Sequence, residues 1–254
     1  MTAPEIRSRI ASLAPWFYEF DLGAHGRTQS ALPPDVRQIF ATRLEMVSRA
    51  VDAAFGPRLR EIRCLDAGCH EGFYSVALAR KGAAYVRGVD VRESSLQKAR
   101  FVAAALGLAN LEFEQQNCER LEGREGEFSL TLLLGILYHL ENPMLCLRNV
   151  ARLTGELCIV ETQVIDEVEG ETEWGSVEWR RPYQGALALI DESGEFYNQN
   201  PETGASPLAL CPSPKALETM LHHAGFRRLE VIEPPPGAYE QHRRRKRLVY
   251  AAWK

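Results

Sequence analysis

The chain has 254 residues and a mass of 28.5 kDa, with 45% hydrophobic and 25% charged residues, as in ordinary globular proteins. Its formal charge of -4 and isoelectric point near 5.9 argue against a broad nucleic-acid-binding face. No run approaches 18 uncharged apolar residues, and the first ten residues carry charges where a signal peptide needs an apolar core, so we expect a cytoplasmic protein.

The first 58 residues precede the alternating pattern that fills the rest of the chain, and we interpret them as a helical cap or lid. A helical pattern covers residues 34–55. Before it lies an aromatic cluster from Trp16 to Phe20, in which Trp16 and Tyr18 are candidate substrate contacts. Core packing of an N-terminal helix pair explains this cluster as well as a ligand lid does.

Residues 59–254 are expected to form one α/β domain, because strand-like and helix-like runs alternate along them. The expected strands are 62–66, 84–90, 110–115, 128–134, 156–162, 227–233 and 247–253. The expected helices are 72–81, 93–107, 142–153 and 213–224. The sequence therefore predicts a Rossmann-like, seven-stranded, mostly parallel sheet with helices on both faces and a terminal antiparallel hairpin.

A glycine-rich turn follows the first predicted strand, with the spacing D-x-G-x-x-x-G from Asp66 to Gly72. Glycine lets the backbone approach a ligand, and the amides that open the next helix point toward that ligand. His70 occupies the place of the second glycine of a dinucleotide fingerprint, where it would crowd a pyrophosphate. We therefore predict that S-adenosylmethionine (SAM), rather than NAD, binds at Asp66, Ala67, Gly68, His70 and Gly72.

Two further loops extend this predicted cofactor site. Asp90, with Val91 beside it, ends the second strand, and one carboxylate accepts two hydrogen bonds from the vicinal hydroxyls of a ribose. Asn117, Cys118 and Glu119 follow the third strand, where an adenine ring is expected. The asparagine and the glutamate serve equally well as turn-forming residues.

The loop after the fourth strand faces both the cofactor and the methyl acceptor. Leu134 and Gly135 are candidate cofactor contacts, and Tyr138 and His139 are candidate catalytic residues. The imidazole of His139 could act as a general base for an acceptor hydroxyl, amine or thiol. A structural role, in which His139 only holds the loop by hydrogen bonding, explains its presence equally well. The ring of Tyr138 either contacts the sulfonium or packs.

A segment at about 164–212 follows no alternating pattern and is rich in acidic and aromatic residues. It is either a solvated acidic face or an inserted substrate cover, with Trp179 and Tyr183 as candidate substrate contacts. The six cysteines form no CxxC pair, which suits reduced, packed thiols, and no spacing of His and acidic residues predicts a metal.

The segments LDAGCHEGFYS, FSLTLLLGILYHLENPMLCLRNVARLTGELCIVETQVID and SPKALETMLHHAGF resemble the methyltransferase family that includes the tRNA wobble-uridine carboxymethyltransferase. The resemblance covers roughly residues 60–254, and GILYH is its most specific part. It implies a class I SAM-dependent methyltransferase with the donor at the Gly68 turn. It also implies that Tyr138 and Arg247 lie near the transferred group. Arg247 is in addition a candidate substrate contact.

The chain departs from this family pattern before the sheet. The carboxymethyl enzymes use a lysine there to bind the carboxylate of carboxy-SAM, whereas the first lysine of this chain is Lys81. An unpaired carboxylate in a closed site is costly, so we expect ordinary SAM as donor. With the acidic charge balance, this favours a small-molecule acceptor with an O, N or S atom. The alternatives are tRNA modification, supported by the basic run 243–246, and a SAM-binding module without catalysis.

Overall fold

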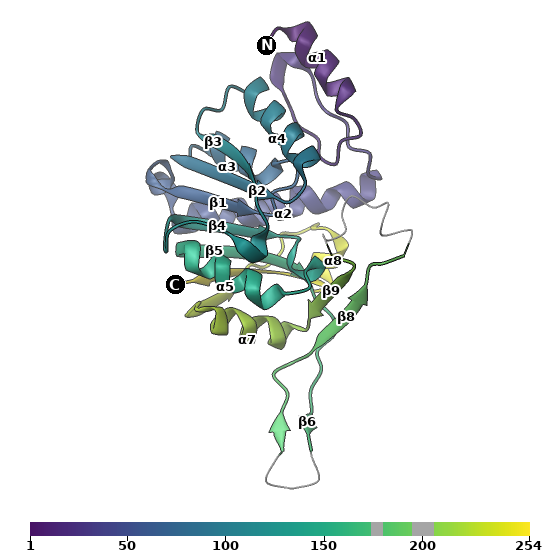
Figure 1. The fold of residues 1–254 in the computed structure, drawn as a ribbon, viewed down its shortest axis with the longest axis vertical. Coiled ribbons are helices and arrows are strands. Elements are labelled where there is room, and N and C mark those ends of the chain that lie inside the picture. Colours follow the sequence, from purple (N-terminus) through teal and green to yellow (C-terminus); the bar gives the residue numbers. More distant parts are fainter. Residues whose placement is uncertain (174–179, 195–205) are drawn as a thin grey trace.

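The computed structural model describes residues 1–173, 180–194 and 206–254. The described residues form a seven-stranded sheet in the order β10-β11-β5-β4-β1-β2-β3 (Figure 1). Its strands are β1 (Arg63–Ala67), β2 (Tyr85–Asp90), β3 (Leu111–Gln115), β4 (Phe128–Leu134), β5 (Thr154–Gln163), β10 (Arg228–Val231) and β11 (Arg247–Trp253). The predicted mostly parallel sheet is confirmed.

The strand directions place one set of loops at a common edge. β1 pairs in parallel with β2 and β4, β2 with β3, and β4 with β5, so the carboxyl ends of these five strands lie together. β11 is antiparallel to both β5 and β10, which confirms the terminal antiparallel hairpin. Ligands of open α/β sheets bind outside the carboxyl ends of the strands, so this edge is where a site is expected.

Helices cover both faces of the sheet and enclose two apolar clusters. One cluster packs α2 (Pro34–Ala54), α3 (Phe73–Lys81) and α4 (Glu93–Ala105) against one face, and the other packs α5 (Pro143–Leu153) and α7 (Pro214–Ala224) against the opposite face. Strand residues alternate between the clusters, as Cys64 and Leu65 show, because successive side chains of a strand point to opposite faces.

Local signals in the sequence set the helix boundaries. Proline lies in the first turn of α2, α5 and α7, where its missing N–H costs no hydrogen bond. Gly82 and Gly225 end α3 and α7 in the left-handed conformation, which leaves their amides free to bond the last carbonyls. These signals explain why the observed ends lie within about two residues of the predicted ones.

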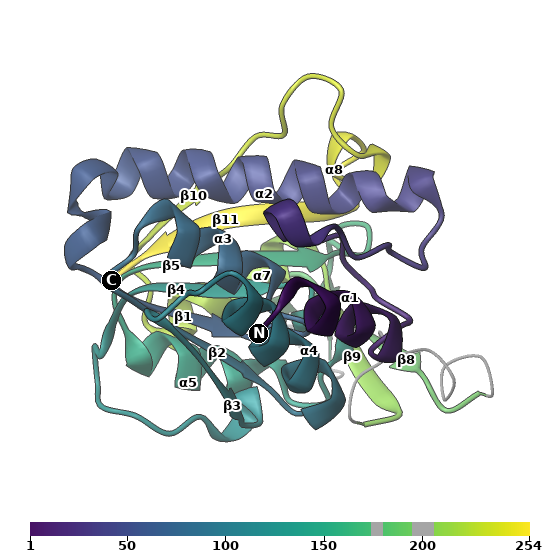
Figure 2. The same ribbon diagram turned by 90° about the horizontal axis from the view of Figure 1, so that it is seen from above.

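The N-terminal region contributes one long helix and an extended segment. α2 lies across the part of the sheet formed by β11 and β10 (Figure 2). Its Thr42 hydroxyl accepts a hydrogen bond of 2.9 Å from the Tyr239 amide, just before α8 (Glu240–Arg243). α1 (Ala3–Ser12), which the sequence analysis did not predict, begins at a capping box formed by Thr2 and Glu5.

The segment predicted to be irregular contains two small hairpins. β8 (Leu187–Asp191) pairs with β9 (Leu208–Pro212), and β6 (Glu171–Thr172) pairs with β7 (Arg181–Pro182). Figure 1 shows the β6–β7 hairpin extending away from the body of the molecule. No helix in the described part of the chain is long and apolar enough to cross a membrane.

Candidate functional site

The turn between β1 and α3 is fixed by backbone geometry. Gly68 has a φ of +78°, and a Cβ at this position would lie 2.5 Å from the Ile136 side chain. The amides of Gly68 and Cys69 both donate to the Val89 carbonyl, at 2.8 and 2.9 Å. Its left-handed conformation favours glycine at position 68, and the missing Cβ leaves room for Ile136 of the loop after β4.

Asp90 joins this turn to the end of β2. Its Oδ2 accepts a hydrogen bond of 2.9 Å from the His70 amide, and its Oδ1 accepts one of 2.9 Å from the Arg92 amide. The carboxylate is thus held in one orientation and keeps further lone pairs for a ligand, because each oxygen accepts more than one hydrogen bond. This arrangement fits the vicinal hydroxyls of a ribose.

A cavity of about 440 Å³ opens over the carboxyl ends of the strands. Most of the predicted site residues line it: Tyr18, Gly68, His70, Asp90, Val91, Asn117, Cys118, Glu119, Leu134, Gly135, Tyr138, His139 and Arg247. Asn117 also accepts a hydrogen bond of 2.8 Å from the Glu119 amide, so it forms a turn as well as part of the wall. Among the described residues, no group of His, Cys, Asp and Glu is arranged to hold a metal ion.

Three residues of the glycine-rich turn do not line the cavity, contrary to the prediction. Asp66 is buried and accepts a hydrogen bond of 2.6 Å from the Ser75 hydroxyl, and burial raises its pKa to about 6. Ala67 is fully buried. A Cβ at Gly72 would lie 2.6 Å from the Phe113 ring, so this glycine permits packing of α3 against the sheet. These three residues therefore support the turn through packing and hydrogen bonding rather than by lining the cavity.

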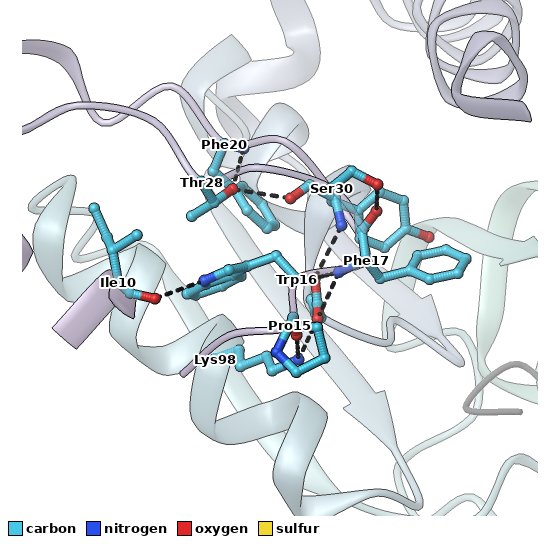
Figure 3. A network of polar contacts seen from close by, with 10 residues as sticks. Ile10, Pro15, Trp16, Phe17, Phe20, Thr28, Ser30 and Lys98 are labelled. Carbon is cyan, nitrogen blue, oxygen red and sulfur yellow. Dashed lines mark hydrogen bonds and ion pairs between the residues drawn. The ribbon is translucent and has the colours of Figure 1, made fainter. Parts of the chain in front are cut away.

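Two predicted substrate contacts also lie away from the cavity. Trp16 is 2% exposed, donates a hydrogen bond of 2.9 Å from its indole to the Ile10 carbonyl and packs against Phe20, which makes it a core residue (Figure 3). Tyr183 is exposed, and its amide bonds to Gly170 beside the β6–β7 hairpin. Trp179 lies outside the described residues.

Glu71, in the turn between β1 and α3, binds the aromatic N-terminal segment. Its buried carboxylate accepts hydrogen bonds of 3.0 Å from the amides of Phe17 and Tyr18. It also forms an ion pair of 2.7 Å with Lys98 of α4, which in turn bonds the Pro15 carbonyl (Figure 3). The side chains of Phe17 and Tyr18 consequently form part of the cavity wall.

A buried charge cluster lies behind the loop that carries Tyr138. Glu161 of β5 is fully buried and pairs with Arg43 at 3.0 Å, with Arg247 at 3.2 Å and with the imidazole of His242 at 3.3 Å. The two guanidinium groups hold the pKa of Glu161 well below its usual range although burial opposes this. Arg247 also donates a hydrogen bond of 2.9 Å to the Tyr138 hydroxyl.

Sequence reasoning missed Arg43, which lines the cavity from α2. The available signal was its position among Ile39, Phe40, Met46 and Val47, on the apolar stripe of the helix. A cation there must find a buried partner, but the sequence does not show that the partner is Glu161 on β5. The N-terminal region has no lysine, so the sequence did not indicate a cation from this region at the site. The structure shows that Arg43 is such a cation.

Sequence reasoning also missed Glu192, whose Oε1 lies 2.9 Å from His139 Nδ1. Burial lowers the pKa of the His139 imidazole, and the neighbouring carboxylate opposes that effect. The residues that line the cavity without a sequence signal come from the N-terminal region, the strand ends, the inserted segment and the α8 region: Phe17, Leu32, Val36, Ile39, Phe40, Arg92, Gln116, Ile136, Leu140, Glu141, Gln163, Ser206, Tyr239 and Gln241.

The strand order, the antiparallel β11 and the cavity at the carboxyl ends define a class I SAM-dependent methyltransferase. Comparison with known proteins gives the family: the chain belongs to the methyltransferase domain family Methyltransf_31, whose model matches residues 59–225.

Two curated relatives differ in the acceptor that their names state. Ubiquinone biosynthesis O-methyltransferase from Neisseria meningitidis is 36% identical over 96 residues, which are 37% of this chain and 40% of that protein. tRNA U34 carboxymethyltransferase from Desulfotalea psychrophila is 28% identical over 200 residues, which are 78% of this chain and 55% of that protein. The matches thus span less than two thirds of the length of either relative.

Solved structures extend the likeness to the whole chain. The N-terminal domain of EvdMO1, crystallised in the presence of S-adenosylhomocysteine (SAH) and D-fucose, matches with a TM-score of 0.68 and 26% identity over 100% of this chain and 95% of that one. Magnesium protoporphyrin IX methyltransferase from Synechocystis, with bound SAH, shares the fold with a TM-score of 0.57 and 17% identity over 89% of this chain and 90% of that one. Both structures were obtained with SAH, the demethylated form of SAM.

Proposed function

We propose that the protein transfers a methyl group from SAM to a hydroxyl group of a small molecule. The observation that carries the proposal is the enclosure of the cavity by two segments outside the strand–helix core. The N-terminal region contributes Phe17, Tyr18 and Phe40 to the wall, and the inserted segment contributes Ser206. A cavity of about 440 Å³ that is covered in this way suits a small acceptor better than a nucleotide within a folded RNA.

A sugar-like acceptor is the first class to test. The N-terminal domain of EvdMO1, which this chain matches over its full length, was crystallised in the presence of D-fucose. Polar side chains at the ends of β4 and β5 suit such a polyhydroxylated molecule, because Tyr138, His139 and Gln163 together offer several hydrogen-bonding groups to the cavity.

The proposed cofactor contacts follow the geometry of the cavity. Asp90 binds the ribose hydroxyls, and the segment Asn117 to Glu119 borders the adenine. Gly68 lets the backbone approach the donor, while Leu134 and Gly135 face it from the end of β4. SAM supplies a methyl group that is electrophilic because it is bonded to a positively charged sulfur.

The chain's own residues orient the acceptor and receive its proton. Tyr138 lines the cavity, and Arg247 donates a hydrogen bond to its hydroxyl and lies with its guanidinium carbon 4.9 Å from the ring centroid. In this proposal the ring also borders the sulfonium, because an aromatic face attracts a cation. His139 accepts the proton of the acceptor hydroxyl as the oxygen bonds to the methyl carbon and the carbon–sulfur bond breaks, leaving its electron pair on sulfur. Alignment in a water-excluding cavity accounts for most of the remaining acceleration.

The proposal is tested by measuring SAH release with a panel of monosaccharides that includes D-fucose, and with phenols, amines and thiols of similar size. We expect turnover with at least one hydroxyl acceptor, and a loss of about 100-fold in kcat for His139→Ala with little change in SAH affinity. Undiminished turnover in that variant would demote His139 to a packing role. Turnover with amines or thiols alone would overturn the hydroxyl assignment.

A second candidate, carboxymethyl transfer from carboxy-SAM to a tRNA wobble uridine, is favoured by one observation. Arg43 and Arg247 both line the cavity while sharing the single carboxylate of Glu161, which leaves positive charge for an anionic group. Calorimetry with SAM and carboxy-SAM separates the candidates. Tighter binding of carboxy-SAM that is lost selectively in Arg43→Met would favour the second.

The tRNA acceptor is less well supported. The basic run 243–246 is engaged with other groups: Arg244 pairs with Glu240, Arg245 with Glu233 and Lys246 with Asp166, and Arg243 donates to the Ala238 carbonyl. These charges are therefore already largely compensated within the protein. A gel shift showing tRNA binding that weakens with added salt would revive this candidate.

A further inference from the structure

The imidazole of His139 has a buried carboxylate partner that comes from the inserted segment. Nδ1 of His139 lies 2.9 Å from Oε1 of Glu192, and the two side chains are only 15% and 6% exposed. The residues are 53 positions apart in the chain, so the contact is created by the fold. Glu192 follows directly on β8, which ends at Asp191.

Hydrogen bonds attach the hairpin of β8 and β9 to the loop after β4, close to Glu192. The Leu210 amide of β9 donates a hydrogen bond of 3.0 Å to the Leu140 carbonyl, one residue after His139. The Ser206 hydroxyl donates one of 2.8 Å to Glu141, and the Glu192 amide bonds to the Pro207 carbonyl. The inserted segment is thus attached directly to the loop that carries the proposed base.

The other groups around His139 leave one imidazole nitrogen for the cavity. The Tyr138 ring lies 4.1 Å from the imidazole, centroid to centroid, and Arg247 and Arg92 are the nearby cations. Nδ1 faces Glu192, whereas no protein group in the described part of the chain bonds to Nε2. Because a neutral imidazole donates from one nitrogen and accepts at the other, a proton on Nδ1 leaves the lone pair on Nε2.

We propose that Glu192 is a positioning residue which fixes His139 as the Nδ1–H tautomer, so that the inserted segment completes the catalytic base of the methyltransferase. The inference rests on the proposed function, because it assumes that His139 accepts the acceptor's proton. The hydroxyl proton moves to Nε2, and the resulting imidazolium is stabilised by the carboxylate through the Nδ1–H hydrogen bond. Glu192 acts only through His139 and touches neither donor nor acceptor.

The direct test is a pH titration of the histidine 15N signals in the SAH-bound protein, comparing wild type, Glu192→Gln and Asp191→Asn. The last variant is a matched control, since Asp191 is an exposed carboxylate that is adjacent in sequence. In the wild type and the control we expect His139 as the Nδ1–H tautomer. In Glu192→Gln we expect a mixture of tautomers and a lower His139 pKa, because the neighbouring negative charge is gone.

A kinetic readout follows once an acceptor is identified. Glu192→Gln should lower kcat on the order of 10- to 100-fold while the KM for SAM stays unchanged, and Glu192→Asp should restore part of the loss. The acid limb of the kcat/KM profile should move to lower pH with the lowered pKa of the base. A role confined to folding would shift the unfolding temperature without moving this limb.

Two results overturn the proposal. One is an unchanged His139 tautomer and pKa in Glu192→Gln, and the other is an equal change in Asp191→Asn. Either result, with SAH binding intact, refutes the dyad and leaves the proposed methyl transfer standing. Failure of the wild-type protein to bind SAH would instead refute the proposed function, so the two failures are distinguishable.

Discussion

Asp90 shows how a single side chain prepares a ligand site before the ligand arrives. Both carboxylate oxygens are oriented by backbone amides of the loops that flank them, so the ribose of the proposed donor would meet acceptors that need not reorganise. Hydrogen bonds to a charged group contribute about 1.5–3 kcal/mol. We therefore expect Asp90→Ala to weaken SAH binding by about 10- to 100-fold in calorimetry.

The control for this prediction is Glu125→Ala, which removes an exposed carboxylate from the loop before β4. It should leave SAH affinity unchanged. Unchanged affinity in Asp90→Ala, in a sample that unfolds at the wild-type temperature, would refute the ribose assignment.

Asp66 gives a pH prediction of definite sign. Burial raises its pKa from 3.8 to about 6 in the folded protein, so the folded state holds the proton to higher pH than the unfolded state does. The stability that this proton provides is present below pH 4 and is lost as the pH rises to about 6, a difference of about 3 kcal/mol.

Asp66→Asn removes this titration while keeping an oxygen to accept the hydrogen bond from Ser75. Relative to wild type, the free energy of unfolding of Asp66→Asn should therefore increase between pH 4 and pH 7 when measured by urea denaturation. Ser95→Ala on α4, which changes no charge, serves as a control. Its free energy of unfolding relative to wild type should not change between pH 4 and pH 7. A flat difference for Asp66→Asn would contradict the raised pKa.

The sequence spacing predicted the turn between β1 and α3 but did not show which of its residues line the cavity. The D-x-G-x-x-x-G pattern correctly predicted a strand, a turn and a helix, yet Asp66 and Gly72 pack behind the turn. Glu71 had no assigned role, although it attaches the N-terminal segment. Arg43 and Glu192 have partners 118 and 53 positions away, and no local pattern in the chain encodes such contacts.

At the scale of elements, the N-terminal segment depends on one carboxylate. Glu71 satisfies two backbone amides and one ammonium group, so Glu71→Ala leaves buried donors without acceptors, at a cost of about 2–4 kcal/mol. We expect faster amide hydrogen exchange in residues 13–32 and weaker SAH binding, because Phe17 and Tyr18 lose their place in the cavity wall.

Glu19→Ala is the matched control for this element. Glu19 belongs to the same segment, but its side chain is half exposed and pairs with Arg37 at the surface. Hydrogen exchange in residues 13–32 should then match the wild type. If both variants exchanged alike, the attachment through Glu71 would not hold the segment in place.

The inserted segment shows where a sequence-based prediction of elements fails. β8 and β9 pair with each other across 16 intervening residues, and Leu187 and Leu189 of β8 are exposed, so this strand has no buried face that produces a period-two signal. By contrast, β1, β4 and β5 are buried on both faces and appear as continuous apolar runs, which the sequence analysis located within about two residues.

At the scale of the whole molecule, the buried charge cluster joins elements that are remote in sequence. Arg43 of α2 and Arg247 of β11 line the cavity and both pair with the buried Glu161 of β5. The N-terminal region, the middle of the sheet and the last strand therefore share one ion-pair network. The alternation of strands and helices predicted the sheet, but it did not predict this connection. The cavity is therefore a property of the complete fold rather than of the glycine-rich turn alone.

Because donor binding draws on loops from most of the chain, SAH should stabilise the protein against global unfolding. A ligand that binds only the folded state at 100 times its Kd adds about 2.7 kcal/mol, which for a chain of this size raises the unfolding temperature by about 5–10 °C. NAD at the same concentration should give no shift, since His70 narrows the space that a pyrophosphate needs. Asp90→Ala should reduce the SAH shift with the logarithm of the affinity, to about half for a 10-fold loss. A shift with NAD and none with SAH would contradict the assignment of the donor site.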